Sequence, residues 1–469
     1  MKIAVIINDK RINNKQISYL VDNFRDISIC NIVIIGPFGI DEIKNLSADC
    51  YLVYGEENPV SKELPTIIIP YCNYTNQLEE YVFLESGLRY TGMEIANRLP
   101  ILKYSIVGEE IEGIRNENQI RLNFDLFWNC FFHMSLYREY LYEEKHGDLG
   151  SYFNKLKVPA EVIEIPVVNC LFSMLENLLS SFLAINYRND RQFSILLTHD
   201  IDALFKTLLN RSKQALFYGY NGLRKILSGQ IKPGFSDFGK AAKHFITPAN
   251  YSNIDEIIKL DHALKVQSIF FIYSKERNIN DWFKYWIFDP QYDIAKKRIR
   301  NILLELHDKT VLTGLHASFS AYQDFKKYQR ELTILTTLMG PVEWNRNHWL
   351  KFSVHDTFDI LEQAGIKNDS TLGFNDQTGF RSGLCTPYFP YNFKEEKAYE
   401  IREYPLNIMD CTLFNYLRLN NDEALKKAKN IKQWVKVFDG VLTLNWHNHV
   451  YSSDYNWHLI LKDLIGDVK

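Results

Sequence analysis

The chain from about Arg191 onward alternates apolar runs of strand length with helical patterns, and this alternation restricts it to α/β folds. Five apolar runs rich in β-branched and aromatic residues are predicted to be strands, over residues 193–198, 267–273, 310–316, 342–346 and 441–446. Apolar residues at helical spacing lie between them, over residues 253–266, 292–307, 323–338 and 422–437. Strands separated by helices pair in parallel, and enough of them can close into a barrel.

The first part of the chain has the rhythm of a smaller α/β unit. Short apolar runs predict strands over residues 3–7, 32–35, 51–54 and 66–69, and helices are predicted over residues 122–143 and 160–185. No G-x-G-x-x-G sequence follows any of these strands, so a dinucleotide site is not expected. We therefore predict an N-terminal α/β accessory domain over residues 1–185, serving packing or assembly, and a second domain over residues 186–469.

Composition and charge narrow the class of partner. Of the 469 residues, 46% are hydrophobic, 24% are charged and 14% are aromatic, which is typical of folded proteins with large cores and also suits stacking on sugar rings. The formal net charge is −3, and no block of basic residues stands out. Because phosphate binding needs concentrated Lys and Arg, no nucleic-acid partner is expected.

The cysteines and the apolar segments predict a soluble, cytoplasmic protein. The 7 cysteines are scattered and form no C-x-x-C pair, so reduced thiols are expected rather than a disulfide framework or a zinc ribbon. The apolar run at the N-terminus is too short for a signal peptide. The best candidate for a membrane span, residues 167–185, contains Glu176 and several polar residues, so no transmembrane segment is expected.

Polar and charged residues lie at or just beyond the C-terminal ends of four of the five strands predicted in the second half. In chain order they are Asp200 and Asp202, then His316, then Arg346 and His348, and last His447 and His449. Active sites of parallel α/β barrels are built at the C-terminal ends of the strands. The four strand ends together therefore predict an active site at that rim.

The segment T-H-D-I-D at residues 198–202 carries the two acids. Side chains alternate along an extended chain, so Asp200 and Asp202 point the same way and His199 points the other way. Two converging carboxylates repel each other unless a cation or a shared proton relieves them. One acid can therefore bind a metal while the other acts as a base. The alternative for Asp202 is the N-cap of a following helix.

The later strand ends can complete such a site. An imidazole of His316 beside two carboxylates would allow a metal site that is rich in oxygen ligands and has at most two imidazoles. The alternative is that His316 is a hydrogen-bonded core residue, as a lone histidine more often is. Arg346 and His348 share a face by alternation, so Arg346 could hold a carboxylate while His348 completes the coordination. His447 has the ordinary pKa of a general acid. Trp349 suits either core packing or sugar stacking.

Four segments resemble motifs of the polysaccharide deacetylase superfamily, the carbohydrate esterases of chitooligosaccharide deacetylase type. Residues 198–202 resemble the first motif, T-F-D-D, with one residue inserted between the acids. His316 and Ser318 resemble H-[ST]-x-x-H. Residues 346–349 resemble the third motif in their Arg and aromatic residue, and residues 444–447 match the last motif, L-x-x-H. All four occur in the order that the family has.

The chain looks closer still to a divergent bacterial subgroup that has an extra N-terminal domain and is often associated with surface-polysaccharide synthesis. The shared patterns are T-H-D-x-D, G-L-H-x-S and R-x-H, with blocks like residues 369–374 and 379–383. The resemblance implies an α/β fold with a distorted (β/α) barrel. It also implies a metal-dependent hydrolase that removes an N-acetyl group from an amino sugar, with an amino-sugar-containing small molecule or glycan precursor as partner.

The resemblance implies roles for the strand-end residues. A divalent metal, with Zn²⁺ as the first candidate, would have as ligands Asp202, His316 and His348. Asp200 would act as the catalytic base, His447 as the catalytic acid, and Arg346 would orient Asp200. The family has a second histidine where this chain has Ser320, so either His348 substitutes for it or the site is weakened or lost.

The substrate contacts implied are Arg381, Trp446, Trp349 and Tyr388, with Arg381 contacting an anionic group. Two alternatives stay open. The first is a catalytically inactive glycan- or precursor-binding protein on the same barrel, which the serine at position 320 favours. The second is a deformylase or another amide hydrolase, because the same attack by water serves both reactions. The sequence does not predict the oligomeric state.

Overall fold

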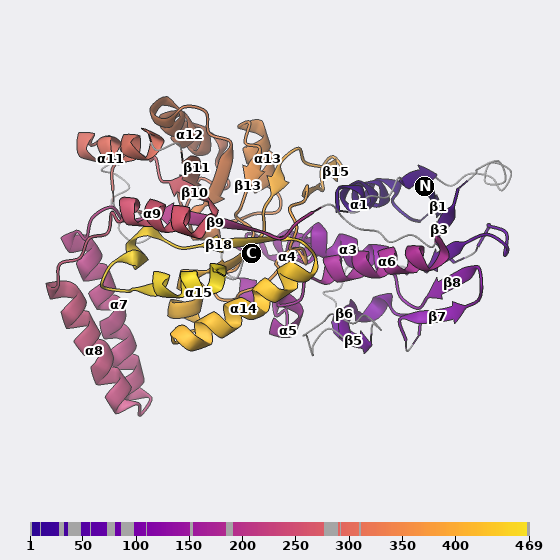
Figure 1. Cartoon of the computed structure of the whole chain (residues 1–469), viewed down its shortest axis with the longest axis horizontal. Helices are drawn as coiled ribbons and strands as arrows, with labels where there is room; N and C mark the ends of the chain where they lie inside the picture. The colour runs from indigo at the N-terminus through magenta and orange to yellow at the C-terminus, as the bar shows by residue number, and fades with distance from the viewer. Residues whose placement is uncertain are drawn as a thin grey trace.

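The structure is a computed structural model of the 469-residue chain. It describes residues 2–9, 11–27, 32–35, 48–56, 58–72, 80–85, 98–108, 110–150, 153–183, 191–275, 289–290, 292–308 and 311–466. Two larger sheets organise these residues, and they lie toward opposite ends of the long axis (Figure 1). The predicted domain boundary at residue 185 lies outside the described residues, so the division into two domains stays a prediction.

The C-terminal sheet has eight described strands in the order β16-β13-β12-β11-β10-β9-β18-β17. Every neighbouring pair is parallel. The strands are β9 (Ser194–Ile201), β10 (Gln267–Ile272), β11 (Leu312–Ala317), β12 (Trp344–Asn347), β13 (Asn368–Asp369), β16 (Arg402–Glu403), β17 (Leu406–Met409) and β18 (Val441–Asn445). All five strands predicted for this half are present, and β9 runs three residues further than expected, to Ile201.

The sheet curls into a distorted barrel. Its two edge strands, β16 and β17, are separated in the chain only by Tyr404 and Pro405, so the two edges must come together. The backbone N–H of Leu406 donates a 2.9 Å hydrogen bond to the carbonyl of Leu372, just beyond β13. This closure directs the carboxyl ends of the strands toward one another, where the fold class predicts a site.

Helices connect the strands and cover the barrel. The four predicted helical patterns form α9 (Ile254–Leu264), α11 (Lys297–Asp308), α12 (Phe325–Met339) and α14 (Asn421–Val437), and α13 (Thr357–Gln363) follows β12. Side-chain caps fix the starts of α12 and α14: the side chain of Asp324 accepts from the backbone N–H of Lys327, and Asn420 forms a capping box with Glu423. Each strand is covered by helices on one face and by the barrel interior on the other. Both of its faces are therefore buried, which explains why the apolar runs in the sequence are nearly continuous.

The N-terminal sheet has the order β2-β1-β3-β4-β8-β7 and is parallel except for β7. Its strands are β1 (Ile3–Ile7), β2 (Ile32–Ile35), β3 (Cys50–Tyr54), β4 (Thr66–Ile69), β7 (Glu112–Arg115) and β8 (Gln119–Leu122). A separate hairpin pairs β5 (Tyr81–Glu85) with β6 (Arg98–Leu102). The four predicted strands are confirmed, and α1 (Asn14–Ile27) lies between the first two.

The two helices predicted near the end of this region are each divided in the structure. Residues 122–143 form the end of β8, then α3 (Leu126–Met134) and part of α4 (Tyr137–His146), because Leu136 has a left-handed backbone with φ of 59°. Residues 160–183 form α5 (Ala160–Ile163) and α6 (Val167–Leu183), with Pro166 between them. Residues 184 and 185 lie outside the described residues.

Buried polar contacts join the N-terminal region to the barrel. The guanidinium of Arg381 donates to both carboxylate oxygens of Glu139 on α4, at 3.0 and 2.7 Å. Glu143 accepts from the hydroxyl of Ser353 at 3.0 Å, and the side chain of Asn169 on α6 accepts from the backbone of Cys385 at 2.8 Å. One apolar core runs through both regions.

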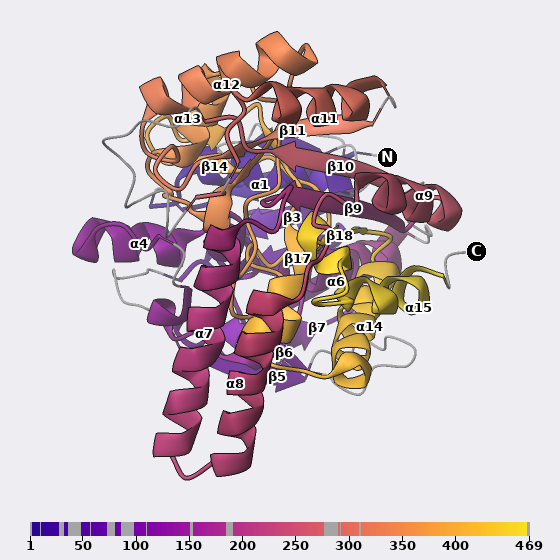
Figure 2. The ribbon, with the colours of Figure 1, turned by 90° about the vertical axis from the view of Figure 1, so that its left-hand side faces the viewer.

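A long helical hairpin not predicted from the sequence follows β9. It consists of α7 (Leu208–Leu227) and α8 (Ile231–Ile246), and it projects from the barrel as an arm (Figures 1 and 2). Within the ranges given above, no helix combines the length and apolarity that crossing a membrane requires.

Candidate active site

The parallel register of the barrel brings the predicted strand-end residues together. On β11 and β12, His316 lies directly beside Arg346. On β18 and β9, Asn445 lies beside Thr198, two residues before Asp200. The side chains of Asp200, His316 and Arg346 are at most 4% exposed, so the cluster lies at the buried inner edge of the strand ends.

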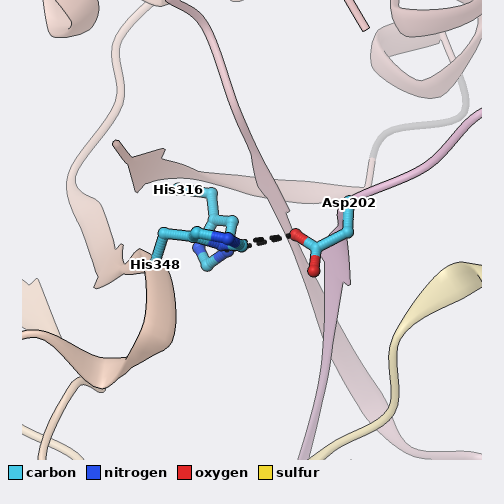
Figure 3. A group of neighbouring side chains, drawn as sticks. All are labelled: Asp202, His316 and His348. Carbon is cyan, nitrogen blue, oxygen red and sulfur yellow. Dashed lines mark hydrogen bonds and ion pairs between the residues drawn. The ribbon is translucent and has the colours of Figure 1, made fainter. Parts of the chain in front are cut away.

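Asp202, His316 and His348 form a compact group of donor atoms (Figure 3). Nε2 of His316 lies 3.3 Å from Oδ1 of Asp202 and 2.8 Å from Nδ1 of His348. Nδ1 of His348 lies 3.5 Å from the same carboxylate oxygen. One oxygen and two imidazole nitrogens, from β11 and from the residues that directly follow β9 and β12, thus face a common point. We call Asp202, His316 and His348 the donor group.

The donor group fits a divalent metal ion. Nδ1 of His316 lies 3.0 Å from the carbonyl oxygen of Arg346, which can only accept, so Nδ1 carries a proton and Nε2 is the nitrogen that could coordinate a metal. Oδ1 of Asp202 is buried and has no hydrogen-bond partner among the described residues. A buried carboxylate oxygen beside two imidazole nitrogens is the chemistry of zinc and related ions.

The protonation of the group is consistent with this role. Burial alone would raise the pKa of Asp202, but His348, His316 and His447 outweigh it and hold that pKa well below its usual value. Burial lowers the pKa of His348 to about 3, so this imidazole is neutral. Burial also opposes charge on His316, but Asp200 and Asp202 raise its pKa, so a metal ion would compete with a proton there.

Asp200 is held beside the donor group as a second carboxylate. Nη1 of Arg346 lies 3.2 Å from its Oδ1, and Nδ2 of Asn445 donates to its Oδ2 at 2.8 Å. Burial works to raise the pKa of Asp200, but Arg346, His316 and His447 lower it overall, so the group is ionised. Its Oδ2 lies 3.9 Å from Nε2 of His316. Asp200 and Asp202 therefore face the same space, as alternation along β9 predicts.

Arg346 is fixed on every side. Its side chain is fully buried, donates to the hydroxyl of Thr198 at 2.6 Å and to the carbonyl of Ser370 at 2.9 Å, and lies over the ring of Phe271. An arginine with these contacts has little freedom to move, so it sets the orientation of Asp200.

His447 faces the two acids from the opposite side. Its Nε2 lies 3.6 Å from Asp202 and 3.9 Å from Asp200. Its Nδ1 lies 2.8 Å from Oδ1 of Asp410, whose other oxygen accepts from the backbone N–H of His447 at 2.7 Å. Burial works against the charged form, but Asp410 holds the pKa of His447 well above its usual value. His447 is therefore a protonated imidazole aimed at the cluster.

A second set of potential metal donors shares His447. Asp410, Cys411 and His447 offer an oxygen, a sulfur and a nitrogen within 4.8 Å of one another. The Nδ1 of His447, however, is already engaged by Asp410, and the Sγ of Cys411 lies 3.8 Å from it. The carboxylate of Asp410 is therefore taken up by His447, whereas Oδ1 of Asp202 faces only the two imidazole nitrogens of the donor group.

The backbone after β12 is strained where it presents His348. Trp349 and Leu350 have φ of 59° and 49°, in the left-handed region that bulky residues avoid. The carbonyl of Trp349 accepts from Asn375 at 2.9 Å, and the side chain of Asn347 donates to the carbonyl of Lys351 at 2.9 Å. These bonds hold the short turn η5 (His348–Leu350), which places His348 and Trp349 at the site.

The cluster opens into a cavity of about 480 Å³. Its polar end consists of Asp200, Asp202, His316, His348 and His447. The remaining lining comes from α7, from η5, from the loop after β13, and from the end of β17 with the segment that follows it. It comprises Lys213, Gln214, Phe217, Asn221, Trp349, Leu350, Asn375, Met409, Cys411, Asn415, Tyr416 and Arg418. A cavity of this size suits one or two sugar rings.

Three of the four predicted substrate contacts lie elsewhere. Arg381 is 8% exposed and is bound to Glu139 and to the carbonyl of Gly373. Trp446 is fully buried and donates to the carbonyl of Trp457, and Tyr388 is fully buried beside β16. The described residues lining the cavity include none of the three. Residue type suggested substrate contact, but apolar packing and a carboxylate from α4 hold these side chains instead.

The structure also places His199, Asp202 and Asp410 relative to the strand ends. His199 points away from the acids, with Nδ1 2.8 Å from the carbonyl of Trp446 and Nε2 3.0 Å from Asp261. Asp202 does not cap a helix, because α7 begins at Leu208 and is capped by Thr207. Asp410 was missed because β17 follows Pro405 and is only four residues long, although an acid after the apolar run L-N-I-M gave a weak signal.

No model of a known protein family matches the chain, and no curated protein sequence matches it. Among solved structures, a Bordetella bronchiseptica protein described as a polysaccharide deacetylase involved in O-antigen biosynthesis is similar at 13% identity and a TM-score of 0.28, over 56% of this chain and 82% of that chain. The carbohydrate deacetylase Agd3 is similar at 9% identity and a TM-score of 0.31, over 99% of this chain and 83% of that chain. At such low similarity, the fold and the site rest on strand pairing and side-chain geometry.

Proposed function

We propose that the protein is a metal-dependent hydrolase that removes the N-acetyl group of an amino sugar in a glycan precursor. One observation carries the proposal. A donor group suited to a divalent ion, a second ionised carboxylate and a protonated imidazole share one cavity and lie within 4 Å of one another. Hydrolysis of an amide needs these three functions together: activation of water, acceptance of its proton and protonation of the departing amine.

The metal would be held by Asp202, His316 and His348. A divalent ion there would supply Lewis acidity, which makes water a stronger acid and stabilises negative charge on the substrate oxygen. The hydrogen bond from Nδ1 of His316 to the carbonyl of Arg346 keeps the other nitrogen available for this purpose. The neutral state of His348 serves the same end.

Asp200 is the group that would take the proton from the attacking water. Arg346 and Asn445 each occupy one of its oxygens, which fixes the carboxylate and leaves it ionised. A fixed carboxylate about a hydrogen-bond length from the reacting water can act as a general base without reorganising.

His447 would give a proton to the departing amine nitrogen. Asp410 holds its Nδ1 and stabilises the imidazolium, so Nε2 carries a proton into the cavity. The overall reaction consumes one water and yields acetate and a free amino sugar. A protonated imidazole at this position favours an amide substrate, because the amine of an amide leaves only after its nitrogen is protonated. Phe217, Trp349 and Tyr416 in the lining offer rings on which a sugar could stack.

The test is release of acetate by the purified full-length protein, with and without added Zn²⁺, Co²⁺ or Ni²⁺. The substrates would be N-acetylglucosamine, its oligomers and its nucleotide-linked form, each compared with the N-formyl analogue. Metal-dependent acetate release that is lost in His447→Ala supports the proposal. Formate release alone would identify a deformylase. Binding of these sugars without hydrolysis in any metal would indicate a glycan-binding protein.

A further inference from the structure

The α7–α8 hairpin exposes large apolar side chains in two continuous rows. On α7, Leu216, Tyr220, Leu223 and Leu227 follow one another at helical spacing, and on α8 Ile231 and Phe235 do the same. Their exposed fractions range from 52% for Leu223 to 79% for Leu227. Scattered exposed apolar residues are ordinary, but a contiguous set of this size marks a surface that is covered by something. We call these six residues the outer face.

The outer face points away from the barrel. The two helices meet at Gly222 and Gly234, where a Cβ atom on either glycine would lie within 2.8 Å of the other's carbonyl oxygen. With 3.6 residues per turn and antiparallel helices, this contact line places both apolar rows on the same side of the hairpin. The other side of α7 faces the active-site cavity through Gln214, Phe217 and Asn221. Figure 2 shows the hairpin projecting freely from the body.

The same hairpin is strongly basic. Residues 208–246 contain seven Lys and Arg but a single acid, Asp237, whereas the whole chain has a net charge of −3. Asp237 is bound to Lys225 at 2.6 Å. Arg224 and Lys232 are exposed next to the apolar rows, and Lys240 and Lys243 are exposed further along α8. The basic residues are too dispersed in sequence to stand out as a block, and the hairpin brings them together.

We propose that the outer face docks on an anionic membrane surface. Large apolar side chains flanked by Lys and Arg are the composition of interfacial helices, in which rings and aliphatic chains enter the acyl boundary and cations meet lipid phosphates. A second copy of the chain fits less well, because it would oppose two strongly positive hairpins. A nucleic acid would pair with the cations but would leave Leu216, Leu227 and Phe235 exposed to water.

Docking in this way would hold the active-site cavity near the membrane, on the side of the hairpin that faces the barrel. Lys213 of α7 lines that cavity, only three residues before Leu216 of the outer face. A substrate carried on a lipid would reach the site by extending around the hairpin, across about one helix diameter. This consequence rests on the proposed function, whereas docking itself does not.

The experiment measures binding of the full-length protein to vesicles by co-sedimentation at physiological ionic strength. The vesicles consist of phosphatidylcholine alone or of phosphatidylcholine mixed with phosphatidylglycerol. We expect clear binding to the anionic vesicles and at least tenfold weaker binding to the neutral ones. Arg224→Glu with Lys232→Glu should weaken anionic binding by more than about tenfold, since each basic residue at a membrane surface contributes about fivefold.

Apolar variants separate insertion from simple charge attraction. Leu223→Gln with Leu227→Gln should reduce binding to anionic vesicles about tenfold while circular dichroism and metal content stay unchanged. The matched control for the charge variant is Lys426→Glu with Lys429→Glu on the exposed side of α14, and the control for the apolar variant is Leu459→Gln; both controls should bind like wild type.

Three results would overturn the proposal. The first is equal binding, or none, to both kinds of vesicle. The second is a lipid-free dimer in light scattering that Leu223→Gln with Leu227→Gln dissociates, which would assign the outer face to a second copy. The third is tight binding of a single-stranded oligonucleotide that the charge variant abolishes, in protein that does not bind vesicles.

Discussion

The two sheets both carry charged residues just beyond their strands, but they expose them differently. In the N-terminal sheet, Asp9 follows β1 and Glu56 follows β3, and both are paired with Arg11, whose side chain is 48% exposed. In the barrel, Asp200 and Arg346 are 4% and 0% exposed. The open sheet leaves Arg11 and Glu56 largely in water, where ion pairs contribute little. Curling the barrel buries them, so their charges act on one another and on a ligand.

This contrast indicates what turns a strand end into a site. Burial by itself favours the neutral form of an ionisable side chain, and only specific charged or hydrogen-bonding neighbours favour the charged form again. Asp200 and Asp202 stay ionised because arginine and imidazoles surround them. His447 stays protonated because the carboxylate of Asp410 lies beside it. The arrangement keeps a base and an acid side by side in opposite protonation states, which is what acid–base catalysis requires.

The largest effect is expected from breaking the donor group. Asp202→Asn removes the carboxylate charge while keeping the shape, so bound metal and amidase activity should both fall by about a thousandfold or more. Metal analysis by plasma mass spectrometry and acetate release would measure this. The matched control is Asp9→Asn at the end of β1, which should change neither quantity. An equal loss of metal and activity in both variants would show that the end of β9 is not a more specific metal site than the end of β1.

The next largest effect separates the base from the ligands. Asp200→Asn should lower kcat by about 10²- to 10⁴-fold while the metal content stays at the wild-type level. Loss of metal in this variant would instead make Asp200 a ligand. Thermal unfolding of the same samples would show whether loss of the partner of Arg346 has altered the fold.

The pairing of His447 with Asp410 predicts a pH effect. Asp410→Asn removes the charge that raises the pKa of His447, so the acid would lose its proton at a lower pH. We expect kcat to fall by about a hundredfold and the alkaline limb of the pH–rate profile to move to lower pH. The measurement is kcat over a pH series. An unchanged alkaline limb would exclude His447 as the acid.

A buried carboxylate outside the site predicts pH-dependent stability. Burial raises the pKa of Glu331, which accepts from the backbone N–H and hydroxyl of Ser318, to about 7. Between pH 4.5 and about 7 the folded state keeps this proton and the unfolded state releases it, so stability should fall as pH rises through that window. Glu331→Gln should flatten the fall in denaturant unfolding. Glu305→Gln, on the exposed side of α11, should leave it unchanged.

The smallest effect is expected at the cavity wall. Trp349→Ala removes a ring that can stack on sugar, so KM should rise about tenfold with kcat nearly unchanged. Trp446→Phe is the comparison, because Trp446 is buried beneath the strand ends and should affect stability rather than KM. A larger fall in kcat than in affinity for Trp349→Ala would mean that the turn after β12 mainly positions His348.

Much of this arrangement could be predicted from the sequence, because it depends on local periodicity. Alternation places Asp200 and Asp202 on one face, and parallel pairing brings the ends of β9, β11, β12 and β18 to one rim. What could not be predicted depends on contacts distant in sequence or on very short elements. Arg381 pairs with Glu139 on α4, and β13 and β16 are only two residues long. The hairpin was missed because Gly222 and Gly234 weaken its helical pattern.

The most direct test of metal binding by the donor group is an anomalous diffraction map at the zinc edge, from crystals of the full-length protein grown with Zn²⁺. We expect one strong peak about 2.0–2.2 Å from Nε2 of His316, Nδ1 of His348 and a carboxylate oxygen of Asp202. A peak among Asp410, Cys411 and His447 instead, or no peak with the cavity filled only by water, would contradict this expectation.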